Sequence, residues 1–291
     1  MNRRIFVTGV MTAAAQAQDS LSGGPVLGYA LDAERRVRPL LGPAGSAYLA
    51  AQMEGGSGLR AWAGSYGLDE EGFVYYGVGA AELRRVEEAG GGWQNVIPAA
   101  RPELALVQNG SRVVRLRGGL ADGAVELGFA AARLALGADG ERMVGADGER
   151  CAGWSADGRQ VFQYPISGVR ALQVLPGNGG FLGLAETLFS MDEAGQKEDY
   201  GAVVGTGMAL TMDGAMVVIL DAEGMVVRTL NLATRAWQSW ELPAAARQLL
   251  PLRDGHTFAV MGDAGEAMWT LALRGPNARW AQVPMAIGGR K

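Results

Sequence analysis

The sequence has almost no cysteine or histidine: Cys151 and His256 are the only residues of their types among 291. A single cysteine excludes an internal disulfide and any multi-cysteine zinc site. A single histidine excludes a site that needs two imidazoles. We expect Cys151, on a predicted strand, to be a small buried residue and not a reactive thiol. His256 directly follows an Asp-Gly turn, a usual place for a half-exposed polar residue.

The sequence also lacks a large charge excess and the common catalytic motifs. Its formal net charge is −4 and its basic residues are scattered, so we expect no nucleic-acid partner. It contains no G-x-S-x-G elbow, no phosphate-binding loop and no H-E-x-x-H motif. No partners for a Ser-His-Asp triad can be assigned to His256. These absences favour a protein that binds without catalysis and without a cofactor.

No apolar run is long enough to cross a bilayer, so no stable membrane span is expected. The first residues instead resemble an export signal, with Arg3 and Arg4 as a basic region, a short apolar region, and the cleavage pattern Ala15-Gln16-Ala17. We expect residues 1–17 to be removed as a signal peptide, which places the mature protein in the periplasm or outside the cell. A Sec signal is favoured, and the paired arginines leave a twin-arginine signal open.

Glycine, in contrast, is abundant, with 45 residues. It recurs after Asp, Asn or Glu in pairs that mark tight turns, because glycine adopts positive φ at no steric cost. We predict type I′ hairpin turns at these pairs. Six of them are 38, 30, 39, 35 and 41 residues apart, with their glycines at positions 72, 110, 140, 179, 214 and 255. The chain therefore repeats at a period typical of propeller blades.

A second repeat is independent of the turns. Four segments begin with an aromatic residue and end in proline, at residues 93–98, 162–165, 237–243 and 280–284. Their prolines are 67, 78 and 41 residues apart, close to two, two and one of the turn intervals. We expect Trp93, Trp237 and Trp280 to share one position in the repeat and to pack in the core or between repeats. Trp62, Trp154 and Trp269 lie elsewhere and could face an axial pocket.

Each unit reads as four short strands, most clearly over residues 208–242, where β-branched and aromatic runs alternate with breaks. Four antiparallel strands per repeat of this length predict an all-β fold, a β-propeller. Six units begin near residues 60, 99, 131, 167, 204 and 244. The unit 99–130 is short enough to lack a strand, and residues 79–90 are compatible with a helix.

Residues 25–53 add a hairpin and a third strand before the six units. We interpret them as an extra blade that C-terminal residues complete, because joining the two ends in one blade would close the ring. The prediction is therefore a single domain, residues 18–291, of seven four-stranded antiparallel blades. Six blades with an N-terminal accessory hairpin are the alternative.

The stretch LNLATRAWQSWELP, residues 230–243, resembles the end of a blade in bacterial periplasmic or secreted β-propellers of the broad YVTN, NHL and quinoprotein-like group. Blades of that group often end in an acidic-x-A-T-G-x-x-x-W tail, and Asn231 and Arg235 stand where aspartate and glycine would be usual. The resemblance covers about residues 60–286 as architecture. It implies the fold and carries over no functional residue.

The segment GADGERMVGADGERCAGWSADGR, residues 137–159, contains Ala-Asp-Gly three times. Calcium-binding nonapeptide arrays repeat strictly, whereas the aspartates here are 8 and 10 residues apart. We therefore expect the three turns to join the four strands of one blade, residues 131–165, and not to bind calcium.

A second acidic segment contains the weak candidates for a metal site, Asp192, Glu193, Glu198 and Asp199. Carboxylates on one loop could supply several calcium ligands. However, the segment lacks the order of an EF-hand, and Lys197 within it opposes a cation. A solvated turn is the favoured interpretation.

We expect a secreted or periplasmic β-propeller that acts as a non-enzymatic binding module, with an unknown protein or small-molecule ligand at the propeller axis. The alternative is a propeller enzyme, a lactonase-like hydrolase or a quinoprotein-like oxidoreductase, with an axial site. A third candidate is a structural envelope protein that docks by its blade edges.

Overall fold

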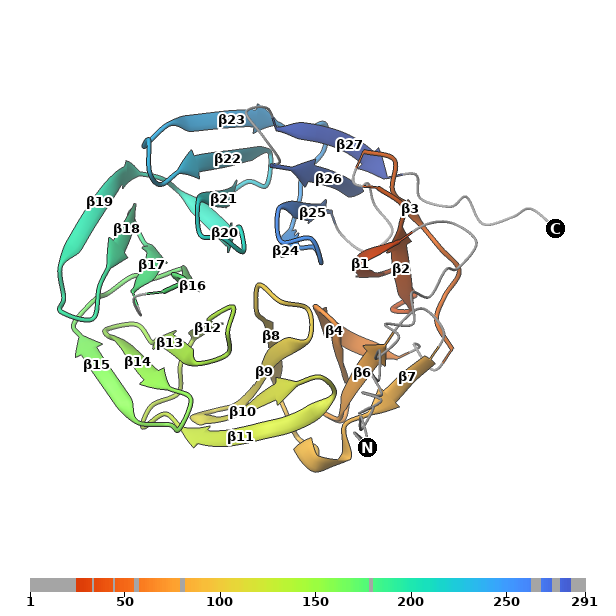
Figure 1. The fold of residues 1–291 in the computed structure, drawn as a ribbon, viewed down its shortest axis with the longest axis horizontal. Helices are drawn as coiled ribbons and strands as arrows, with labels where there is room; N and C mark the ends of the chain where they lie inside the picture. Colours follow the sequence, from red (N-terminus) through yellow and green to blue (C-terminus); the bar gives the residue numbers. More distant parts are fainter. Residues whose placement is uncertain are drawn as a thin grey trace, which may run out of the picture.

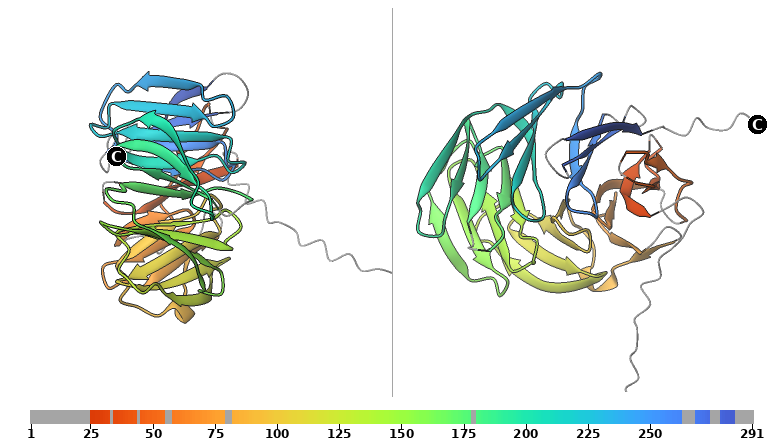
Figure 2. Two further views of the ribbon diagram at one scale, coloured as in Figure 1. Left: turned by 90° about the vertical axis from the view of Figure 1, so that its left-hand side faces the viewer. Right: turned by 45° about the horizontal axis from the view of Figure 1, so that its top comes forward.

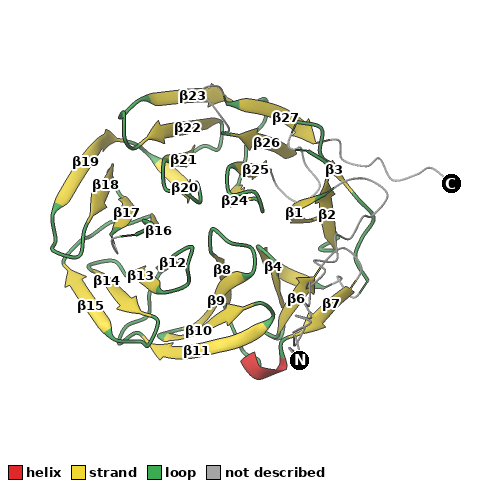
Figure 3. Cartoon of the chain, viewed as in Figure 1, coloured by secondary structure: helices red, strands yellow, loops and turns green. Residues whose placement is uncertain are grey.

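The chain folds into a ring of strands. The computed structural model describes residues 25–32, 34–43, 45–54, 58–78, 82–177, 180–262, 268–273 and 278–283. These residues form 27 strands and one short 3-10 helix, η1 (Glu87–Ala89), the red segment of Figure 3. The strands make seven antiparallel sheets that surround one axis as blades (Figure 1), in a disc that is thinner than it is wide (Figure 2). The fold is a seven-bladed β-propeller, as predicted.

We number the blades in chain order. Blade 1 contains β1 (Val26–Leu31), β2 (Val37–Leu41) and β3 (Tyr48–Leu49), and blade 2 contains β4 (Leu59–Ala63), β5 (Tyr66–Asp69), β6 (Val74–Val78) and β7 (Glu82–Arg85). Blade 3 contains β8 (Asn95–Pro98), β9 (Leu104–Asn109), β10 (Arg112–Arg117) and β11 (Leu120–Glu126). Blade 4 contains β12 (Arg133–Leu136), β13 (Arg142–Ala146), β14 (Cys151–Ser155) and β15 (Gln160–Tyr164).

The other three blades follow the same pattern. Blade 5 contains β16 (Ala171–Val174), β17 (Phe181–Leu184), β18 (Thr187–Met191) and β19 (Lys197–Ala202). Blade 6 contains β20 (Gly205–Leu210), β21 (Met216–Asp221), β22 (Val226–Asn231) and β23 (Trp237–Glu241). Blade 7 contains β24 (Gln248–Pro251), β25 (Thr257–Met261), β26 (Met268–Ala272) and β27 (Arg279–Val283). Blades 2 to 7 run in chain order from the axis to the rim (Figure 1), and each predicted unit start lies within four residues of a first strand.

The Ala-Asp-Gly turns join the four strands of blade 4, as predicted. The predicted type I′ geometry is wrong, because Arg35 and Arg235 are the only described non-glycine residues with positive φ. In the first and third Ala-Asp-Gly turns only the glycine takes the left-handed conformation, with φ of 79° at Gly140 and 84° at Gly158. Asp139 keeps negative φ, and its carboxylate accepts the amide two residues further on at 2.9 Å. The arrangement fits a type I turn closed by a left-handed glycine.

Residues 99–130 contain three strands, β9 to β11, so this unit lacks a strand as predicted, although blade 3 as a whole has four. Its first strand, β8, lies in WQNVIP, which the sequence pattern placed at the end of the preceding unit. The other three aromatic-to-proline segments contribute to the rim strands β15, β23 and β27. Trp93 therefore does not share a position with Trp237 and Trp280. Trp93 is 2% exposed beside β8, whereas Trp237 is 36% exposed on the rim.

The stretch that was compatible with a helix, residues 79–90, forms strand β7 and then the single turn η1. Residues 79–81 lie outside the described ranges. Residues 241–250 connect β23 to β24 without a helix. No helix in the described residues is long and apolar enough to cross a membrane.

The hydrophobic core lies between the blades. Seven clusters of buried side chains fill the seven spaces between neighbouring blades. Blade 1 closes the ring by packing Leu27 and Leu49 against Leu252 and Val283 of blade 7. The last described strand, β27, belongs to blade 7. The C-terminal residues predicted to complete blade 1, residues 284–291, lie outside the described ranges, as do residues 1–24.

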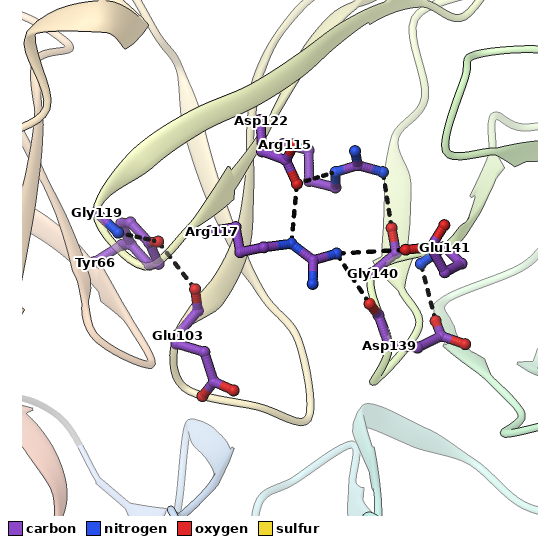
Figure 4. Close-up of polar contacts among 9 residues, drawn as sticks. All are labelled: Tyr66, Glu103, Arg115, Arg117, Gly119, Asp122, Asp139, Gly140 and Glu141. Atoms are coloured by element: carbon purple, nitrogen blue, oxygen red, sulfur yellow. Dashed lines mark hydrogen bonds and ion pairs between the residues drawn. The ribbon is translucent and has the colours of Figure 1, made fainter. Parts of the chain in front are cut away.

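Polar contacts also join neighbouring blades, as between blades 3 and 4 (Figure 4). Arg115 and Arg117 of β10 both bind Asp122 of β11, with N–O distances of 3.1 and 2.9 Å. Arg115 then donates to the carbonyl of Gly140 at 2.9 Å, and Arg117 to that of Asp139 at 3.1 Å. Burial opposes ionisation of Asp122, but the two arginines hold its pKa below the ordinary value. The first Ala-Asp-Gly turn is thus held by the preceding blade.

Candidate functional site

Blade 1 differs from the other blades in its strand number. Its described strands form a three-stranded sheet in the order β1, β2, β3, so β1 is the inner edge. Figure 1 shows that β8 and β24 reach nearer the centre of the ring than β1 does. Within the described residues, the place closest to the axis in blade 1 is therefore not filled by a strand.

β1 also runs opposite to the innermost strands beside it. Its first residues lie beside the loop that follows β24, because the amide of Arg253 donates to the carbonyl of Leu27 at 2.8 Å. The loop after β1 lies beside the start of β4, because Arg35 pairs with Glu70. Glu70 adjoins the end of β5, which pairs with the start of β4. The strands of blade 1 thus have the directions of second, third and fourth strands, and the described residues provide no innermost strand for this blade.

A cavity of about 370 Å³ lies in this place. Its walls include β1, the innermost strands β4, β8 and β24 of blades 2, 3 and 7, and parts of β25 and β26. The lining is mainly apolar and aromatic, with Tyr29, Leu31, Trp62, Leu250 and Met261 among its residues. Its volume falls within the range of about 300–1,000 Å³ that ligand pockets occupy. The cavity is therefore large enough to receive a ligand.

The inner edge of β1 presents backbone groups to this side. In β2, the carbonyl of Val37 accepts the amide of Met53 at 2.9 Å, on the side away from β1. Leu31 stands opposite Val37 in the β1–β2 register, so the pair is not hydrogen-bonded across the two strands. The N–H and C=O of Leu31 therefore point away from β2. Such an edge is a template on which another strand can pair.

A β-bulge sets Arg60 apart in the first strand of blade 2. In the β4–β5 register, Leu59 pairs with Asp69 and Ala61 with Leu68, so Arg60 is an extra residue without a partner position. β20, the innermost strand of blade 6, carries a bulge at the same place, whereas β8, β12, β16 and β24 pair with their second strands without one. Bulges redirect a side chain, and at β4 the redirected residue is charged and lines the cavity.

The guanidinium of Arg60 is only partly satisfied. Its Nη2 donates to the carbonyls of Trp93 and Gln94, the latter at 3.0 Å. Its Nε is buried and has no hydrogen-bond partner among the described residues. None of the ion pairs formed by the described residues includes Arg60. An incompletely paired cation in a partly dry site favours the approach of an anionic group.

The other charged residues of the cavity already have partners. Asp32 is 5% exposed at its side chain and binds Arg36 with an N–O distance of 2.8 Å. Burial alone would raise the pKa of Asp32, but the hydrogen bonds and charge of Arg36 hold it below the ordinary value. Arg35 pairs with Glu70.

Sequence reasoning missed Arg60, because its position depends on a bulge and on strands that lie far apart along the chain.

The four weak metal candidates are each engaged separately. Asp192 accepts the backbone amides of Ala194 and Gln196. Glu193 pairs with Arg142 of blade 4, and Glu198 pairs with Arg235 of blade 6. Asp199 accepts the hydroxyl of Thr187 and the amide of Gly201. No group of three or more His, Cys, Asp or Glu side chains gathers anywhere in the described residues. The structure does not bring these carboxylates to one point.

Of the three tryptophans that could face an axial pocket, Trp62 lines the cavity. Trp154 and Trp269 pack in the cores between blades 3 and 4 and between blades 6 and 7. Cys151 is buried between blades 4 and 5, and burial raises the pKa of its thiol to about 12. His256 lies in the turn between β24 and β25, outside the cavity lining.

One of the comparisons with known proteins supports this architecture. No family model matches the sequence, and no curated protein matches it either. The β-propeller domain of Myceliophteria thermophila Cps50 (Swd1) superposes with a TM-score of 0.50 at 12% identity, over 66% of this chain and 73% of that one. Kuenenia stuttgartiensis hydrazine synthase gives 0.47 at 9% identity, over 65% of each chain. The first likeness supports the propeller fold. Membership of the YVTN, NHL and quinoprotein-like group stays a prediction.

Proposed function

We propose that this protein is a non-enzymatic binding module that takes up an extended segment of a partner protein in blade 1. The segment occupies the innermost strand position and pairs with the inner edge of β1. The observation that carries the proposal is the direction of β1, which leaves the described part of blade 1 without an innermost strand. An added strand satisfies edge backbone groups and places alternate side chains in the cavity.

The cavity chemistry supports a polypeptide occupant. Apolar walls such as Leu31 and Leu250 suit side chains that alternate along a strand. The innermost strands β4 and β24 of the neighbouring blades lie on either side of blade 1 (Figure 1). Addition of a strand there repeats the architecture of the other six blades.

Residues 284–291 of the same chain are the competing occupant. Their sequence, PMAIGGRK, contains two adjacent glycines, which weaken a strand. It also contains no acidic residue that could pair with Arg60. These features favour a partner segment over the chain's own end.

The test is peptide selection on the purified full chain. Short random peptides are displayed, selected, and measured in solution by fluorescence polarisation, with Kd values expected at micromolar or below. Ala61 is half-buried and lines the cavity, so Ala61→Trp fills the space and weakens binding about tenfold or more. Gln248 is exposed at the start of β24 and also lines the cavity, so Gln248→Trp is expected to weaken binding by a similar factor. The matched control is Ala124→Trp on the rim strand β11, which leaves binding unchanged.

Three results overturn the proposal. The first is selection that yields no peptide. The second is a set of peptides whose affinity changes with neither Ala61→Trp nor Gln248→Trp, which places their site elsewhere. The third is binding only to a chain that ends at Val283, which means that residues 284–291 fill the position themselves. Circular dichroism of each variant shows that a loss of binding is not a loss of fold.

We also propose that the protein acts in the periplasm or outside the cell. The support is the export pattern of residues 1–17, with its basic start and its Ala-x-Ala end. In that setting the partner would be another exported protein. Mass spectrometry of the mature N-terminus tests this proposal.

A further inference from the structure

We infer that the partner segment carries an acidic residue near its N-terminal end, and that Arg60 recognises it. This inference rests on the proposed strand addition. It concerns which side chain the segment carries, which the position of the added strand does not determine. Three observations carry it: the partly satisfied guanidinium of Arg60, the direction of β1, and the pairing of the other charged residues in the cavity.

The first observation is that Arg60 has donor capacity left. Its Nη2 is used by two carbonyls, while its Nε is buried without a partner in the described part of the chain. A guanidinium offers five N–H donors in a planar fork that matches a carboxylate. Burial by a peptide removes the remaining water, so only an anionic or strongly accepting group keeps the cation stable.

The second observation fixes where in the segment the acid lies. An added strand that pairs antiparallel with β1 runs parallel to β4 and β24, as an innermost strand should. Arg60 lies at the start of β4, and Gln248 at the start of β24. The same end of the cavity is lined by Asp32 and Arg35, which follow β1. The segment therefore enters with its N-terminal residues beside Arg60.

The third observation is that the other charged residues at this end of the cavity are already paired. Asp32 is already paired with Arg36, and Arg35 with Glu70. A basic residue entering at this end meets Arg60 and no available carboxylate among the described residues, which is unfavourable. An acidic residue meets Arg60. The remaining residues of the segment face Trp62, Leu250 and Met261 and are best apolar at alternate positions.

The test uses the selected peptides and charge-altered chains. The peptides are expected to share a Glu or Asp in their N-terminal half, and its replacement by Gln or Asn weakens binding about 10- to 100-fold. Arg60→Gln weakens binding of the acidic peptide by a similar factor and leaves the affinity for the Gln- or Asn-substituted peptide unchanged. Arg60→Lys keeps the charge and retains part of the affinity. Arg60→Glu restores binding to a peptide with Lys in place of the acid, a reciprocal result that a structural role cannot give.

The matched control is Arg133→Gln. Arg133 lies at the start of β12, the innermost strand of blade 4, and likewise donates to a backbone carbonyl, that of Arg170, at 2.7 Å. It is outside the cavity lining, so its replacement leaves peptide affinity unchanged.

The outcomes separate this inference from the proposed function. Peptides whose affinity falls with Ala61→Trp but which contain no acidic residue would contradict the inferred acidic residue and leave strand addition supported. The same holds for peptides whose affinity does not change with any Arg60 variant. An acid in the C-terminal half overturns the assigned direction of the segment. If selection yields no cavity-dependent peptide, both proposals fail.

Discussion

Two charged residues near one end of the cavity, Asp32 and Arg60, differ in how completely their hydrogen bonds are formed. Asp32 accepts the amides of Glu34 and Arg36 at 3.1 and 2.9 Å and the Nε of Arg36 at 2.8 Å. Arg60 has two carbonyl acceptors and a buried Nε without a partner in the described chain. Complete pairing at Asp32 fixes the β1–β2 hairpin and hence the wall of the cavity. Incomplete pairing at Arg60 leaves a place for a ligand group.

Asp32→Ala should destabilise the fold by about 1–3 kcal/mol at neutral pH, because it leaves the amide donors of the hairpin without their acceptor. The pKa of Asp32 is lowered from the model-compound value of 3.8. Its stabilisation is therefore present above about pH 4 and is lost as the pH falls below that value. The difference in unfolding free energy between wild type and variant, measured in urea, should shrink at low pH.

The control for this prediction is Glu34→Ala. The Glu34 side chain is 63% exposed, so its removal should change stability by less than about 0.5 kcal/mol. A difference between wild type and Asp32→Ala that stays constant from neutral to acidic pH would contradict the role assigned to the carboxylate.

At the scale of the element, the hairpin turn is the unit that repeats most faithfully. The amides of Gly140 and Gly158 each donate to the carbonyl three residues earlier, and both glycines have positive φ. Gly148, in the middle turn of the same motif, is not among the glycines with positive φ. Three identical Ala-Asp-Gly sequences thus adopt two backbone geometries.

Gly140→Ala should therefore destabilise the protein, and Gly148→Ala should not. An alanine at 140 keeps φ near 79° only with strain of about 1–2 kcal/mol. Its Cβ would also lie 2.7 Å from Nη2 of Arg117, which bridges blades 3 and 4. A Cβ at 148 meets nothing within 4 Å. Thermal or urea unfolding measures both, and equal effects of the two substitutions would contradict the assigned turn geometry.

At the scale of the whole molecule, much of the ring could be predicted from local patterns. Turn glycines recur about once per unit, so their spacing predicted six units, and the apolar strands of residues 25–53 predicted the seventh blade. The position of the turn in the blade is not constant, because Gly72 and Gly110 lie in second hairpins whereas Gly140 lies in a first hairpin. The chemistry of WQNVIP does not distinguish the end of one blade from the start of the next, and β8 was assigned to the wrong unit. The direction of β1 could not be predicted either. VLGYAL is equally apolar as a first or a second strand, and only contacts with blades 2 and 7 reveal its direction.

The compartment in which the whole molecule acts depends on whether residues 1–17 direct export. If residues 1–17 are a Sec signal, expression in a bacterial host should yield a periplasmic or secreted protein that begins at Gln18, as read by mass spectrometry. Ala17→Arg should block cleavage, since the cleavage site needs small side chains.

The paired arginines separate the two export routes. Arg3→Lys with Arg4→Lys keeps the positive charge that a Sec signal needs, so export and cleavage should continue, whereas a twin-arginine signal needs the arginines themselves. Arg84→Lys with Arg85→Lys, at an exposed pair on β7, is the matched control and should be exported normally. Cytoplasmic retention of the Arg3 and Arg4 variant alone would show the twin-arginine route and export after folding. An exported chain that still begins at Met1 would contradict cleavage, because residues 1–17 would then belong to the mature protein.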